Sequence, residues 1–259
     1  MSAPAEQGGT TTDGLPDYLV RLVDAADALP LRHRMPQATS TARRSAVLIL
    51  FGEGPGGPDV LLIEKSAHLR SHAGQPAFPG GGADPGEDYP VGPALREAQE
   101  EVGVDPASVR VLATLPALFL GPSDNVVVPV VGWWDDPREI ATADPHEVAK
   151  VARVPLAQLV DPANRFRVRH PAGYVGPAFG VAGMVVWGFT AGLLDAVLQA
   201  AGLSLPWDAR DVRPLTGLAA AAPADSEEDP VDSDVADRAA PTVAEDAGRP
   251  GSPRTVPGP

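Results

Sequence analysis

Residues 78–104 of the chain read FPGGGADPGEDYPVGPALREAQEEVGV. The first part of this segment is rich in glycine and proline and is typical of a loop. The second part predicts a helix over residues 89–102, with Asp88 in the N-cap position and Gly103 ending the helix. The segment therefore combines a glycine-rich loop with a glutamate-rich helix that follows it directly.

Three glutamates of the predicted helix, Glu97, Glu100 and Glu101, have i, i+3, i+4 spacing. Side chains with this spacing project from one helix face, so we expect the three carboxylates to converge. A hard cation such as Mg²⁺ accepts oxygen ligands and would relieve their mutual repulsion. Arg96 can reach Glu100 or an upstream carbonyl, and we interpret it as a residue that orients the carboxylates.

A glutamate-rich helix taken alone is more often a charged face in contact with solvent. Here a glycine-rich loop enters the helix, a glycine ends it, and two apolar strands precede it, over residues 46–52 and 59–64. A solvated face requires none of these features. The context therefore favours a metal site.

The flanking segments predict a mixed order of strands and helices without regular βαβ units, which favours an α+β fold. Residues 67–88 are expected to form a long loop, which inside a compact domain is usually functional. Further strands are expected at 109–115, 126–134, 151–154, 166–170 and 184–187, and further helices at 16–29 and 188–201.

The two ends of the chain differ in composition from the middle. Residues 1–14 are expected to be disordered, and residues 216–259 are expected to form a disordered acidic tail, because few apolar residues are present to offset the ordering entropy. A single domain is expected over residues 15–215.

The composition excludes several classes of function. A net charge of −14 argues against nucleic-acid binding, which needs a basic face. The chain has no cysteine, so disulfides, thiolate nucleophiles and cysteine-ligated metals are excluded. We expect no membrane span and no signal peptide, and therefore a cytoplasmic protein, because no apolar run is long enough and the first residues are polar.

The segment from Gly82 to Val104 resembles the Nudix box: a glycine, five residues, an acidic residue, seven residues, and then Arg96-Glu-Ala-Gln-Glu-Glu-Val-Gly-Val104. Asp88 stands where the family usually has glutamate, and Ala98 is small for an aliphatic position. The resemblance implies the Nudix α/β/α sandwich, in which the box helix packs on a mixed sheet.

The upstream segment is similar to the signature of the coenzyme A pyrophosphatase subfamily. Leu61-Leu-Ile-Glu-Lys-Ser66 is followed by Arg70, Gly74 and Phe78-Pro-Gly-Gly81 at the spacing of that signature. Ile63 and Lys65 replace its threonine and arginine. Asp144-Pro-His-Glu-Val148 and Trp187-Gly-Phe-Thr-Ala191 add to the resemblance, which covers about residues 41–198.

This resemblance implies hydrolysis of the pyrophosphate bond of coenzyme A (CoA) or an acyl-CoA, giving 3′,5′-ADP and (acyl-)4′-phosphopantetheine. Glu97 and Glu101 are the expected ligands of Mg²⁺ or Mn²⁺, with Glu100 as a third ligand or a group that orients water. The backbone of Gly80 and Gly81 would allow close approach to the metal or the phosphates.

Two residues outside the box have open roles. Glu147 is the best-placed candidate for a general base, and the alternative is an ordinary surface glutamate before a strand. Arg70 is a candidate for binding a CoA phosphate, and the alternative is a bond within its own loop.

Two other functions remain open. The box also serves Nudix hydrolases of other nucleoside diphosphate derivatives, such as ADP-ribose or NADH. A non-catalytic Nudix ligand-binding module is the alternative of a different class, although all three box glutamates are present here. The sequence does not indicate an oligomeric state.

Overall fold

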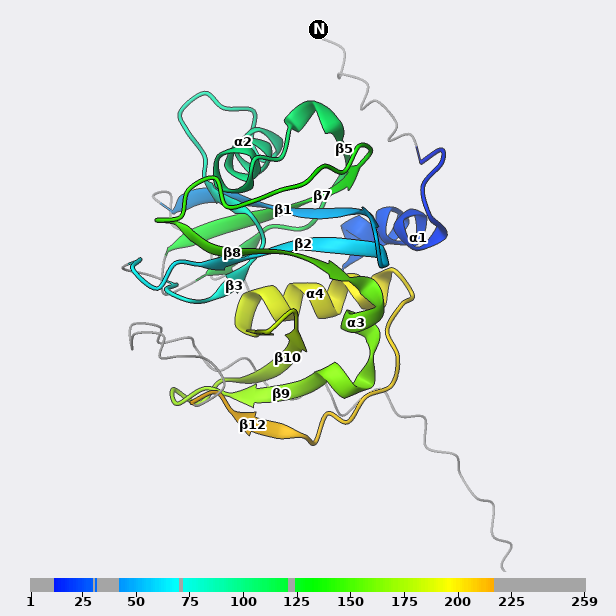
Figure 1. Cartoon of the computed structure of the whole chain (residues 1–259), viewed down its shortest axis with the longest axis vertical. Coiled ribbons are helices and arrows are strands. Elements are labelled where there is room, and N and C mark those ends of the chain that lie inside the picture. The colour runs from blue at the N-terminus through cyan, green and yellow to red at the C-terminus, as the bar shows by residue number, and fades with distance from the viewer. Residues whose placement is uncertain (1–11, 30, 32–41, 70–71, 121–123, 217–259) are drawn as a thin grey trace, which may run out of the picture.

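The structure is a computed structural model that describes residues 12–29, 31, 42–69, 72–120 and 124–216. Its layers are visible in Figure 1, with helix α2 above a large sheet, helix α4 below that sheet, and a second sheet below α4. Within the described residues, no helix is long and apolar enough to cross a membrane.

The large sheet is mixed, because its two long central strands, β1 and β7, are parallel and its other pairings are antiparallel. The strand order is β3-β2-β1-β7-β5, and β4, β6 and β8 pair with β1, β7 and β2 respectively. The strands are β1 (Arg43–Gly54), β2 (Gly57–Lys65), β3 (Pro76–Ala77), β4 (Gly80–Gly82), β5 (Val109–Thr114), β6 (Leu118–Leu120), β7 (Asn125–Trp134) and β8 (Val148–Pro155).

Apolar residues of β1 point alternately to the two faces of this sheet and pack in a hydrophobic cluster on each face. Leu48 and Leu50 pack in the cluster that includes helix α2 (Val91–Val102). Ile49 and Phe51 pack in the cluster that includes α4 (Gly188–Ala200) and α1 (Asp17–Ala25). A strand buried on both faces reads as a continuous apolar run, which is the pattern of residues 46–51.

The second sheet has the order β11-β10-β9-β12. Its strands are β9 (Arg165–Arg169), β10 (Val175–Val181), β11 (Met184–Val186) and β12 (Val212–Pro214). The buried guanidinium of Arg165 pairs with Asp195 of α4 and lies over the rings of Phe179 and Trp207. An ion pair that links β9 to α4, flanked by aromatic rings, fixes this sheet beneath the helix. The remaining short helices are α3 (Leu156–Val160) and the 3₁₀ turns Ala26–Ala28, Pro106–Ser108 and Pro162–Asn164.

The α+β prediction is confirmed, and each predicted strand and helix has a counterpart in the structure. Strand β10, helix α3 and the short strands β6 and β12 were not predicted, and the expected loop at residues 67–88 contains β3 and β4. Helix α2 begins at Val91 and not at Tyr89, and Asp88 does not cap it with its side chain. The backbone carbonyl of Asp88 accepts a hydrogen bond from the N–H of Gly92 instead.

The predicted disordered ends fall mostly outside the described residues, which leave out 1–11 and 217–259. Residues 12–15 form a turn, closed by a hydrogen bond from the Leu15 N–H to the Thr12 carbonyl.

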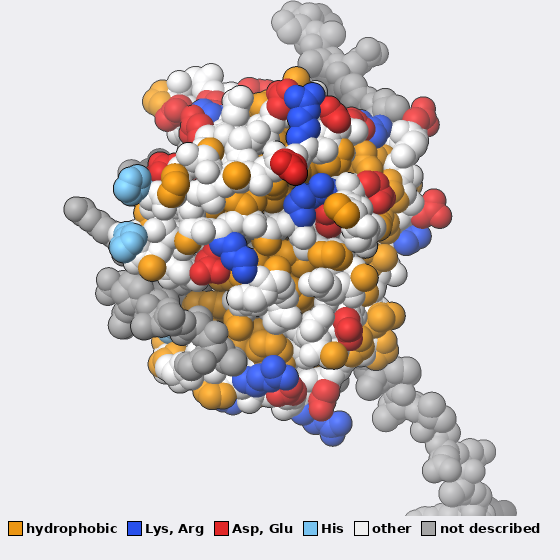
Figure 2. All heavy atoms as spheres, viewed as in Figure 1, with side chains coloured by type: hydrophobic (Ala, Val, Ile, Leu, Met, Phe, Trp, Pro, Cys, Tyr) orange, Lys and Arg blue, Asp and Glu red, His pale blue; other side chains and the backbone are white. Residues whose placement is uncertain are grey.

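Acidic and basic side chains are interspersed on the face of the molecule shown in Figure 2, with apolar side chains between them. On that face the described residues form no broad basic surface.

Candidate active site

The glycine loop is held against the N-terminal half of β1. Gly80 and Gly82 pair with Val47 and Ser45 as strand β4, and the Leu48 N–H donates to the carbonyl of Pro79. Helix α2 follows nine residues after β4 and packs over this edge. Gly103 ends the helix in the left-handed conformation, at φ 74°, as its position predicted. The loop and the helix thereby face each other.

Two of the loop glycines have no room for a side chain. A Cβ on Gly80 would lie 2.3 Å from the carbonyl oxygen of Ala46, and one on Gly81 would lie 2.3 Å from Oε1 of Glu97. A Cβ on Gly82 would meet nothing within 4 Å. Gly80 therefore permits close packing on β1, and Gly81 leaves space for the Glu97 carboxylate.

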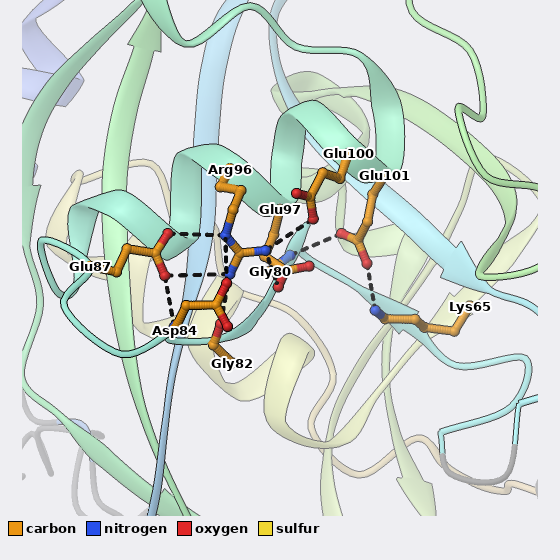
Figure 3. Close-up of polar contacts among 9 residues, drawn as sticks. All are labelled: Lys65, Gly80, Gly82, Asp84, Glu87, Arg96, Glu97, Glu100 and Glu101. Atoms are coloured by element: carbon orange, nitrogen blue, oxygen red, sulfur yellow. Dashed lines mark hydrogen bonds and ion pairs between the residues drawn. The ribbon is translucent and has the colours of Figure 1, made fainter.

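Arg96 connects the loop to the carboxylates of the helix (Figure 3). Its Nη1 donates to Glu97 at 2.9 Å and to Glu100 at 3.0 Å, and its Nη2 donates to the Gly82 carbonyl at 2.8 Å. Its Nε donates to Glu87 at 3.0 Å. The rigid fork of donors in a guanidinium allows one side chain to hold several oxygens in fixed positions. Arg96 thus contacts both Glu100 and an upstream backbone carbonyl, and its role in orienting the carboxylates stays a prediction.

Glu101 points away from Arg96 and is held by different elements (Figure 3). Its Oε1 accepts a hydrogen bond from Lys65 Nζ at 2.6 Å, and its Oε2 accepts one from the Gly80 N–H at 3.0 Å. Its side chain is 1% exposed, against 17% for Glu97 and 58% for Glu100. Glu101 is therefore the most deeply buried carboxylate of the site.

Burial raises the pKa of Glu101 above its usual range, and the charge and hydrogen bond of Lys65 oppose that effect. Burial also raises the pKa of Glu97, which Arg96 opposes. The pKa of Glu87 is lowered, chiefly by its hydrogen bond with Arg96. A carboxylate whose charge is costly to bury is one whose ionised form a bound cation would stabilise.

The expected convergence of Glu97, Glu100 and Glu101 on one point is not seen in these side-chain conformations. Glu97 and Glu100 share Arg96, whereas Glu101 pairs with Lys65. Among the described residues, no three acidic or histidine side chains form a ready metal-binding group.

The donor set nevertheless fits a hard divalent cation. Five carboxylates surround the loop and the helix against two cations, which leaves three formal negative charges. All the donors are oxygens, as Mg²⁺ and Mn²⁺ prefer, and the Glu97 carboxylate lies directly against the backbone of Gly81. The charged residues are Asp84, Glu87, Glu97, Glu100 and Glu101, with Lys65 and Arg96.

Glu147 lies next to this site, with an exposed side chain. The Ser66 N–H donates to its carbonyl oxygen at 2.8 Å, and the Ala143 N–H donates to the backbone carbonyl of Glu101 at 3.0 Å. The segment from Ala143 to Glu147 therefore lies between the end of β2 and the end of α2. Arg70 is outside the described residues.

Three charged residues of the site, Asp84, Glu87 and Lys65, were not assigned to it from the sequence. Glu87 contacts Arg96, whereas Asp88, which occupies the acidic position of the box, is exposed. Lys65 was noted only as a replacement in the upstream signature. The available signal for Lys65 was strand alternation, which places it on the same face of β2 as the buried residues Leu61 and Ile63.

The family model for the NUDIX domain matches residues 41–174. Similar proteins include the uncharacterized Nudix hydrolase NudL of Escherichia fergusonii and its counterpart in Salmonella paratyphi B, each 43% identical over 132 residues. These alignments cover 49% of this chain and 65% of each relative, so the chain spans less than two thirds of the length of these relatives.

Solved structures with a similar fold include a Nudix hydrolase from M. smegmatis, RenU, at 25% identity and a TM-score of 0.39. That similarity covers 46% of this chain and 74% of RenU. Another is the NUDIX domain of Shewanella oneidensis NrtR in complex with ADP ribose, at 21% identity and a TM-score of 0.38, which covers 48% of this chain and 79% of that domain.

Proposed function

The chain belongs to the Nudix family, and from this premise we propose that it is a divalent-metal-dependent hydrolase of the pyrophosphate bond of CoA or acyl-CoA. The products would be 3′,5′-ADP and (acyl-)4′-phosphopantetheine. The observation that carries the proposal is the juxtaposition of the Gly80–Gly82 loop with the carboxylates of α2 around Arg96.

Glu97, Glu101 and Glu100 would hold Mg²⁺ or Mn²⁺. Such an ion, when bound, neutralises the oxygens of a diphosphate and increases the acidity of water. The metal preference of Nudix hydrolases in general is consistent with this all-oxygen donor set.

The chain's own residues have positioning roles in the proposed reaction. Arg96 keeps Glu97 and Glu100 in place relative to the loop through its bond to the Gly82 carbonyl. Gly81 lets the backbone approach the Glu97 carboxylate closely, and the Gly80 N–H donates to Glu101. Phosphoryl transfer depends chiefly on positioning and charge neutralisation, so these contacts matter directly for the rate.

Proton transfer and CoA recognition involve residues outside the box. Glu147 is our candidate for the general base, because its segment lies beside the ends of β2 and α2 and its side chain faces solvent. The choice of CoA as substrate is supported by the upstream signature from Leu61 to Gly81, which includes Arg70.

A substrate panel tests this proposal. We expect the kcat/KM for CoA or an acyl-CoA, with Mg²⁺ or Mn²⁺, to exceed that for ADP-ribose, NADH and dNTPs by about tenfold or more, which corresponds to about 1.4 kcal/mol of transition-state binding. The products are identified by chromatography as 3′,5′-ADP and a 4′-phosphopantetheine. A Glu101→Gln protein purified in parallel controls for contaminating hydrolases.

Preferential hydrolysis of ADP-ribose or NADH would replace CoA with another nucleoside diphosphate derivative. Binding of a nucleotide without hydrolysis of any compound in the panel would favour the non-catalytic module.

A further inference from the structure

Lys65 is the last residue of β2, and its ammonium group is 2.6 Å from Oε1 of the buried Glu101. The other oxygen of that carboxylate accepts the Gly80 N–H. A strand end and a loop backbone thus each hold one oxygen of the same side chain, which lies on a helix.

The backbone of Lys65 is itself fixed. Its N–H donates to the Gln75 carbonyl, and its carbonyl accepts from the Gly74 N–H, each at 3.0 Å. On the other side of β2, Lys65 pairs with Val148 across an irregularity in register between Glu64 and Lys65. The ammonium group is therefore presented to Glu101 from a rigid position.

We propose that Lys65 is a positioning residue that holds the Glu101 carboxylate in place to bind the divalent cation. The inference rests on the proposed function, because it requires Glu101 to be a metal ligand. It also assigns the cationic side chain at the end of β2 to the metal site and not to substrate recognition.

The contacts leave Glu101 free to act as a ligand. An ionised carboxylate has about four lone-pair sites, and Lys65 and Gly80 use one on each oxygen. Each oxygen of Glu101 therefore keeps a lone-pair site that neither of these two contacts uses. Without Lys65, Oε1 would lose its partner, and the buried carboxylate could rotate away from the orientation that the metal requires.

The sequence supplies a matched control, because Lys65 and Lys150 are the two lysines of the chain. Lys150 lies on β8 opposite Glu64, and its Nζ donates to the Ala182 carbonyl in the β10–β11 turn. It therefore points to the opposite side of the large sheet. Removing its charge should leave the Glu101 site intact.

Three variants of the full chain test the role of Lys65: Lys65→Met, Lys65→Arg and Lys150→Met. We expect Lys65→Met to weaken Mn²⁺ binding, measured by calorimetry, and to lower kcat/KM, each by about 10- to 100-fold, as is typical when a partner of a metal ligand is removed. Lys65→Arg should retain most of the Mn²⁺ affinity and most of the kcat/KM of the wild type, and Lys150→Met should match the wild type in both. Wild-type Mn²⁺ affinity in a folded Lys65→Met protein would overturn the inference.

Selective ¹³Cε labelling of lysine provides a second readout in the wild-type chain, in case Lys65→Met does not fold. Two signals are expected, and Lys65→Arg identifies the signal of Lys65 by removing it. We expect titration with Mg²⁺ to shift the Lys65 signal and leave the Lys150 signal in place.

The outcomes separate the two proposals. If neither lysine signal moves and calorimetry detects no Mn²⁺ binding, the metal site of the proposed function is wrong. If Mn²⁺ binds but the Lys65 signal does not move, or Lys65→Met keeps full affinity, only the positioning role of Lys65 is wrong.

Discussion

Replacing Glu101 by glutamine should reduce turnover by about 10²- to 10³-fold while leaving the fold intact, because a metal ion is worth several kcal/mol of transition-state stabilisation and each 1.36 kcal/mol is a factor of ten. Glutamine has nearly the same volume as glutamate, and its amide oxygen can still accept from Lys65 or Gly80. It lacks the negative charge that strengthens the binding of a divalent cation.

The measurement is kcat for the best substrate of the panel at saturating Mg²⁺, together with the melting temperature. Glu64→Gln is the matched control, because Glu64 precedes Lys65 on β2 and its side chain therefore points to the opposite face of the sheet. Near-wild-type turnover in a folded Glu101→Gln protein would refute the assignment of Glu101 as a ligand.

Replacing Gly81 by alanine should lower kcat/KM by about 10- to 100-fold, since a misplacement of about 1 Å in a catalytic group can cost about 100-fold. The new Cβ would lie 2.3 Å from Oε1 of Glu97, so that carboxylate must move. The displaced atoms are the end of a flexible side chain, and we therefore expect the protein to fold normally.

Gly82→Ala is the control for this change, because a Cβ at position 82 meets nothing within 4 Å. We expect Gly82→Ala to retain much more activity than Gly81→Ala, at a similar melting temperature. Equal loss in the two variants would mean that the loop backbone, and not the position of Glu97, limits the rate.

The loop and the box helix could be predicted from the sequence because their signals are local. The glycines, the periodic glutamates and Gly103 lie within 25 residues of one another, and the structure places them as loop, helix and helix end. The paths of the side chains could not be predicted in the same way. The groups that a glutamate side chain contacts come from other elements of the fold, as the Lys65 and Gly80 contacts of Glu101 show.

Lys65 illustrates this limit. It is separated from Glu101 by 36 positions in the sequence, and their contact depends on how β2 and α2 pack against each other. Glu87 is a smaller case, because a one-residue difference in the loop brings Glu87 and not Asp88 to Arg96. The spacing of the box alone does not indicate which of these two adjacent acidic residues contacts Arg96.

The second sheet was only partly predicted, for reasons of composition. Strand β10 contains Gly176, Pro177 and Gly180, which interrupt the pattern of a strand. Proline is tolerated there because β11 pairs with β10 only from Phe179 onward, so that Pro177 has a neighbouring strand, β9, on one side alone. The apolar residues of β10 pack beneath α4 and in the small cluster around Phe166. Strand β12 has three residues and pairs with β9 through a long separation in sequence.

The most direct test of the assignment of Glu97 and Glu101 as metal ligands is Mn²⁺ binding. Binding is measured through the electron paramagnetic resonance signal of the free ion, with the full chain and with a Glu97→Gln/Glu101→Gln variant. We expect the wild-type chain to deplete the free Mn²⁺ signal and the folded double variant to leave it almost unchanged. Equal depletion by the two proteins would show that the carboxylates of α2 do not hold the cation.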